Sequence, residues 1–195
     1  MNDNKYLVCY AMNEFNQQRI KKEDEIQDLD YFLESYQNAT GKELQLLQVS
    51  ERPDFICEDL DGLKYGVELT MITRPPKSRQ WDRIVEKKQY MDSEKVIELI
   101  QHQSFEKNEK RAENDWTLSE NTILVIQLKD ISLFELKPFL TNENFPDLSS
   151  TSFKEIWLGD YSETEAYDSI NTFCLKPKEL FGFYQRSNPY QKPYG

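Results

Sequence analysis

Residues 51–72 read ERPDFICEDLDGLKYGVELTMI, and their pattern predicts the arrangement at the centre of the fold. Two runs that suit β-strands, residues 53–58 and 64–72, lie on either side of Asp59-Leu60-Asp61-Gly62. Asp-Gly between two such runs is a hairpin signal. The sequence therefore predicts two antiparallel strands joined by a tight turn.

Alternation along the second run assigns its side chains to two faces. The face expected to pack in the core carries Tyr65, Val67, Leu69 and Met71, and the opposite face carries Gly66, Glu68, Thr70 and Ile72. In the first run Phe55 and Cys57 suit the core, which leaves Asp54 on the opposite face.

The length of the turn decides whether Asp54 meets Glu68. A two-residue loop at Asp61-Gly62 pairs Asp54 with Leu69, whereas a three-residue loop with Gly62 left-handed pairs Asp54 with Glu68. In the second case the two Cβ atoms lie about 5 Å apart. Carboxylates that close repel unless a proton or cation lies between them, and oxygen ligands suit Mg²⁺. A hairpin with a polar, solvated face is the alternative.

A helix expected over residues 14–38, ending at Gly41, places an acid near its apolar side. Its apolar stripe comprises Ile26, Leu29, Phe32, Leu33 and Tyr36. Glu25 falls within the angular range of this stripe, where a carboxylate costs free energy unless it is paired or bound to metal. Alternatively, Glu25 lies at the solvated end of the stripe or pairs with a lysine.

A second helix, expected over residues 81–113 with a break near 92–93, carries lysines on its inward side. Its stripe comprises Val96, Ile100, Gln103 and Lys107, with Lys110 at the edge. An inward ammonium group could orient an attacking water or offset charge on a phosphate. The alternative is that the lysine stems cover apolar surface while their charged ends stay in water.

The remaining pattern predicts a single α/β domain over residues 1–195, with a central mixed sheet flanked by helices. Further expected elements are strands at 5–11, 122–128, 153–158 and 170–175, a loop at 73–80, a short helix at 131–140 and an irregular aromatic tail at about 183–195.

Composition excludes several classes of protein. One histidine and three widely spaced cysteines cannot build a His/Cys zinc site, and they suggest reduced thiols. No apolar run reaches the roughly 20 residues that cross a bilayer, and no targeting signal is evident, so we expect a cytoplasmic protein. The formal net charge of −11 argues against broad, non-specific binding to nucleic acid.

The two runs RPDFI (52–56) and YGVELT (65–70) resemble the PD-(D/E)XK nuclease superfamily, in particular small bacterial proteins with an "RPDF…GVEhT" pattern, where h is apolar. The expected order of elements agrees with that family over roughly residues 14–130. The resemblance implies a restriction-endonuclease-like fold in which Asp54, Glu68 and Glu25 bind Mg²⁺ or Mn²⁺. It also implies a nucleic-acid partner, with DNA favoured over RNA, and allows a homodimer.

One position departs from the family pattern. Thr70 occupies the place of the motif lysine, and threonine cannot supply a positive charge. Members of the superfamily are known to move this lysine to the following helix, which makes Lys107 or Lys110 the substitute, with Thr70 as a hydrogen-bond partner. The sequence thus favours a metal-dependent nuclease with catalytic residues Glu25, Asp54, Glu68, Lys107, Lys110 and Thr70. The alternative is a catalytically degenerate binding, immunity or regulatory protein.

Overall fold

The computed structural model describes residues 3–72, 93–114, 116–143, 145 and 148–186, with side chains from residue 20 onward except at residue 119. In these residues seven strands form one mixed sheet, and they lie side by side in the order in which they occur in the chain. Its strands are β1 (Leu44–Val49), β2 (Phe55–Asp59), β3 (Lys64–Ile72), β4 (Thr122–Leu128), β5 (Glu155–Asp160), β6 (Asn171–Lys176) and β7 (Gly182–Tyr184).

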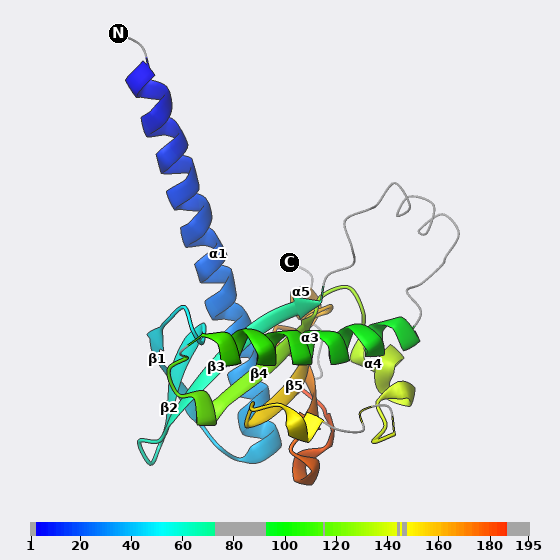
Figure 1. Cartoon of the computed structure of the whole chain (residues 1–195). Helices are drawn as coiled ribbons and strands as arrows, with labels where there is room; N and C mark the ends of the chain where they lie inside the picture. The colour runs from blue at the N-terminus through cyan, green and yellow to red at the C-terminus, as the bar shows by residue number, and fades with distance from the viewer. Residues whose placement is uncertain (1–2, 73–92, 115, 144, 146–147, 187–195) are drawn as a thin grey trace, which may run out of the picture.

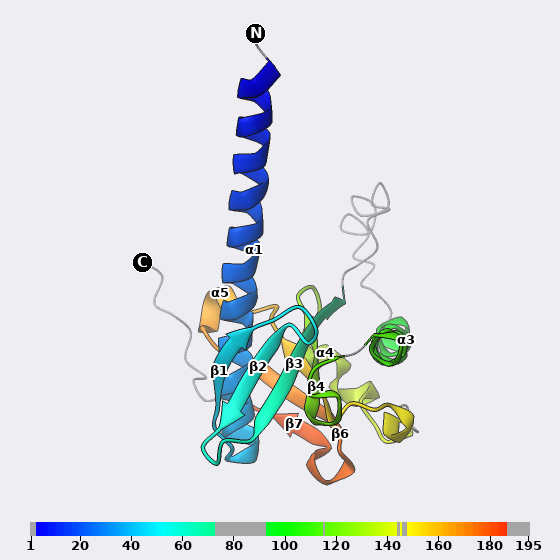
Figure 2. The same ribbon diagram turned by 60° about the vertical axis from the view of Figure 1, so that its left-hand side comes forward.

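In the described part of the chain four α-helices accompany the sheet: α1 (Asp3–Thr40), α3 (Ser93–Glu113), α4 (Leu133–Leu136) and α5 (Thr164–Tyr167). Short 3₁₀ turns span Ser119–Asn121, Lys137–Phe139, Leu148–Ser150 and Lys178–Leu180. Figure 2 shows the sheet between α1 and α3, and both figures show the N-terminal half of α1 extending beyond the sheet (Figure 1). The expected α/β arrangement, a mixed sheet flanked by helices, is confirmed. In the described chain no helix combines the length and apolar character needed to cross a membrane.

The strands pair in three blocks. β1, β2 and β3 form an antiparallel meander, β3, β4 and β5 are parallel, and β6 and β7 return antiparallel. The parallel strands need long connections, and α3 lies within the connection from β3 to β4.

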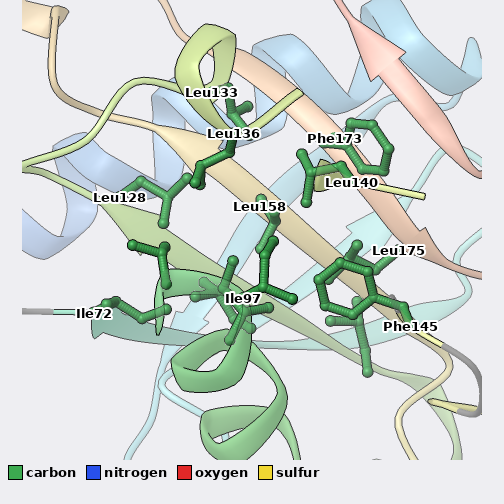
Figure 3. Packing of buried hydrophobic residues seen from close by; sticks show 14 of the residues in the cluster. Ile72, Ile97, Leu128, Leu133, Leu136, Leu140, Phe145, Leu158, Phe173 and Leu175 are labelled. Atoms are coloured by element: carbon green, nitrogen blue, oxygen red, sulfur yellow. The ribbon is translucent and has the colours of Figure 1, made fainter. Parts of the chain in front are cut away.

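Both faces of the central part of the sheet are buried. On one face, Tyr65, Val67 and Leu69 of β3 pack with Leu29 and Phe32 of α1. The other face packs against α3 and α4 through a second cluster that includes Ile72, Ile97, Leu128, Leu136 and Leu158 (Figure 3). The solvated hairpin face considered from the sequence is therefore wrong, because α3 covers the side that carries Glu68, Thr70 and Ile72. β4 is buried at every position, as expected for a central strand.

The hairpin adopts the three-residue loop. Phe55 pairs with Val67, and the Asp59 amide donates to the Leu63 carbonyl at 3.0 Å. Gly62 has φ +81°, the left-handed conformation that glycine adopts at no steric cost. This register places Asp54, the residue before β2, opposite Glu68 of β3.

Three segments differ from the sequence prediction. Residues 5–11 belong to α1 and are not a strand; a strand there would need a neighbour for its backbone groups, whereas a helix satisfies them internally. β1 was not predicted, because its residues Leu44–Val49 do not alternate between apolar and polar. Part of the supposed irregular tail forms β7, which pairs with β6. The expected loop at 73–80, the start of the second helix at 81–92 and residues 187–195 lie outside the described residues.

Candidate metal and catalytic site beside the start of β2

Asp54 lies where β2 begins, and three hydrogen bonds fix it there. Its carbonyl oxygen accepts from the Ser50 amide at 2.8 Å, and its amide donates to Glu68 Oε2 at 3.2 Å. Its side-chain Oδ2 accepts from the Leu69 amide at 2.9 Å. The preceding residue, Pro53, has no amide and lies outside the ladder. The Asp54 carboxylate thus accepts the hydrogen bond of the Leu69 amide of β3, beyond the last strand pair of the hairpin, Phe55–Val67.

Glu68 projects from the middle of β3 toward α3 and is 5% exposed. Lys107 of α3 donates from Nζ to Glu68 Oε1 at 2.7 Å. One turn earlier on the same helix, Gln103 Nε2 donates to Thr70 Oγ1 at 2.9 Å. Residues four apart on a helix and two apart on a strand each share a face, so the two contacts form a matched pair between α3 and β3.

Burial and mutual repulsion act on the two carboxyl groups. Burial raises the pKa of Asp54, against the lowering effects of the Leu69 amide and of the Lys107 and Lys22 charges. Burial also raises the pKa of Glu68, and the Asp54 charge raises it further, while Lys107 lowers it. Two acids face one close ammonium group, which leaves an excess of negative charge that a proton or a cation would neutralise.

Glu25 lies near this site but has its own partners. Lys22 Nζ is 3.0 Å from Glu25 Oε2, and Lys21 Nζ is 3.6 Å from Glu25 Oε1. Lys22 also lies over the Phe55 ring, 4.8 Å from its centroid. The Glu25 charge contributes to the raised pKa of Asp54, the last of its several causes. Across the described residues, however, no three His, Cys, Asp or Glu side chains gather as a metal-binding group.

The two candidate lysines occupy different environments. Lys107 is 19% exposed and contacts Glu68, whereas Lys110 is half exposed and pairs with Glu106 of its own helix at 2.5 Å. Of the two, Lys107 is the one that the structure brings to the carboxylates.

The residues present fit a hard divalent cation in part. Within the described part of the chain, the hydrogen bond to the Asp54 carboxylate falls on Oδ2 and none falls on Oδ1. Mg²⁺ commonly binds through one or two carboxylates and retains several waters, which matches a pair better than a closed cage. Asp54 and Glu68 are the residues that would hold it.

Two side chains that contact the candidate site residues, Gln103 and Lys22, are not predicted as site residues from the sequence. Gln103 was placed on the inward stripe of its helix, but its partner Thr70 could be known only from the packing of α3 on β3. Lys22 stands three residues before Glu25, and this helical spacing was the available signal for their ion pair.

Comparison of the chain with family models, with curated proteins and with solved structures finds no match.

Proposed function

We propose that this chain is a Mg²⁺- or Mn²⁺-dependent phosphodiesterase of the PD-(D/E)XK type that acts on nucleic acid, DNA in the first instance. The observation that carries the proposal is the convergence of Asp54, Glu68 and Lys107, with Lys107 Nζ 2.7 Å from Glu68. Two acids and a lysine, from the residue before β2, from β3 and from α3, supply cation ligands and a positive charge at one point.

The arrangement of elements supports a restriction-endonuclease-like fold. A helix, a three-stranded meander, a second helix and a parallel fourth strand follow one another in α1, β1–β3, α3 and β4. This order agrees with the one that the resemblance implies. The family acid positions 54 and 68 also fall opposite each other in the observed register.

Each residue has a role in the proposed chemistry. A bound cation supplies a water of lowered pKa and neutralises charge on the phosphate. Asp54 and Glu68 would be the residues that bind the cation. Lys107 neutralises part of the Glu68 charge and is placed to stabilise negative charge that develops on the phosphate. Gln103 fixes Thr70, whose hydroxyl retains its hydrogen for donation.

A second candidate is a binding protein that has kept the fold and lost catalysis. Three observations favour it: the direct Lys107–Glu68 ion pair, the engagement of Glu25 with Lys22, and the net charge of −11. In this case the Lys107–Glu68 ion pair blocks the site and has no part in catalysis.

A cleavage assay separates the two candidates. Purified protein is incubated with DNA and RNA substrates in Mg²⁺, in Mn²⁺ and in EDTA, alongside Glu68→Gln. Glu51→Gln is the matched control, since Glu51 is exposed and lies three residues from Asp54. We expect metal-dependent cleavage by the wild type and the control and none by Glu68→Gln. Metal binding without cleavage would support the binding protein, and cleavage by all three proteins would place the activity elsewhere.

A further inference from the structure

We propose that β1 is a self-association surface through which two copies of this chain pair, edge to edge and antiparallel. β1 lies at one end of the sheet, and β2 is its partner among the described strands. A strand at a sheet edge presents unpaired amide and carbonyl groups that can pair with another chain. The inference is independent of the catalytic proposal.

The side chains of β1 lack the features that usually protect an edge. Its sequence, LQLLQV, contains no charged residue and no proline, in a chain that is 30% charged. Leu47 is 51% exposed and Val49 is 40% exposed. Sheet edges are commonly protected by lysine, proline or a bulge. A bulge is present between Leu46 and Gln48, but it carries an exposed leucine.

The strand is also complementary to itself, which favours a second copy over an unrelated strand. LQLLQV reads nearly the same in both directions. In an antiparallel pair with the two-fold axis between Leu46 and Leu47, each of these leucines faces the other in the second copy. Gln45 then faces Gln48, and Leu44 faces Val49. Such isologous contacts are the rule in two-fold dimers.

The flanking charges agree with the same register. Glu43 falls opposite Ser50, and Lys42 falls opposite Glu51, so no like charges meet. Like charges directly opposite each other in an antiparallel pair are destabilising. The paired edges join two seven-stranded sheets into one continuous sheet.

Sedimentation velocity over a wide range of protein concentration tests this interface with two matched double variants. Gln45 and Gln48 are both exposed, so replacing them leaves the core intact. The pair Gln45→Lys with Gln48→Lys sets like charges opposite each other in the dimer. The pair Gln45→Lys with Gln48→Glu sets opposite charges there instead. Circular dichroism melts establish that both variants fold.

We expect the wild type to sediment with twice the monomer mass of 23.3 kDa. We expect the Lys/Glu variant to dimerise and the Lys/Lys variant to dissociate, with a dimer Kd at least ten-fold weaker. A wild type that stays monomeric at every concentration would overturn the proposal. Equal dimerisation of the two double variants would also overturn it, because the interface would then lie elsewhere.

Discussion

At the scale of single residues, the central feature is an imbalance of charge. Asp54 and Glu68 are both drawn out of water, and the one lysine in direct contact with this pair, Lys107, bonds to Glu68 alone. Breaking a buried pair by removing one partner leaves an uncompensated charge. The geometry therefore ties the stability of this region to the same groups that would bind a cation.

The two lysines of α3 give a matched test of position. We expect Lys107→Met to reduce cleavage about a hundred-fold, because it removes the positive charge beside Glu68. It should also lower the free energy of unfolding by about 2 kcal/mol, measured by urea titration. Lys110→Met should leave both quantities nearly unchanged, since Lys110 pairs at the surface with Glu106. Equal effects of the two substitutions would remove Lys107 from the site.

The raised carboxyl pKa values predict a specific pH dependence in the metal-free protein. A carboxyl whose folded-state pKa exceeds its unfolded value binds its proton more tightly when folded. Its stabilising contribution is present below about pH 4 and is lost as the pH rises through the raised pKa. We expect Asp54→Asn to gain thermal stability relative to wild type as the pH rises from this region toward neutrality in EDTA. A difference in melting temperature that is flat with pH would contradict this account.

At the scale of elements, the site depends on how β2, β3 and α3 meet. The hairpin, the placement of Asp54 opposite Glu68 as one of two registers, and the inward side of α3 could all be predicted from residues 51–72 and from helical phase. The choice between registers could not, since it depends on the backbone conformation at Gly62. The covering of Glu68 and Thr70 by α3 could not be predicted either. A strand in a sheet with helices on both sides can be buried on both faces, so its pattern does not tell which face water reaches.

Substitution of Gly66 by alanine tests how closely β3 must approach Pro53 and Asp54. A Cβ atom at Gly66 would lie 2.6 Å from Pro53 Cγ, and Pro53 directly precedes Asp54. We therefore expect Gly66→Ala to cost about 2 kcal/mol in urea unfolding and to weaken cation binding, because Pro53 and Asp54 must shift.

Gly62→Asn is the control for this substitution. Its position has open space around the Cβ and a left-handed backbone that asparagine tolerates. Equal stability of the Gly66→Ala and Gly62→Asn variants would show that the contact with Pro53 does not constrain the site.

At the scale of the whole molecule, the net charge of −11 sets the conditions for binding a polyanion. Phosphate contacts normally need clustered lysine and arginine, whereas a loaded cation makes an acidic site locally less negative. We expect labelled DNA to bind, by fluorescence anisotropy, in Ca²⁺ and not in EDTA. Asp54→Asn should abolish the Ca²⁺ effect, while equal binding in both buffers would point to a different surface.

Calorimetric titration of the metal-free protein with Mn²⁺ tests the proposed cation site itself, with Asp54→Asn, Glu68→Gln and the control Glu51→Gln measured in parallel. We expect binding by the wild type and by Glu51→Gln, and affinity at least ten-fold weaker in the other two variants, because each loses one of the carboxylates that would hold the cation. Absence of Mn²⁺ binding by the wild type, or equal binding by all four proteins, would contradict the metal site at Asp54 and Glu68.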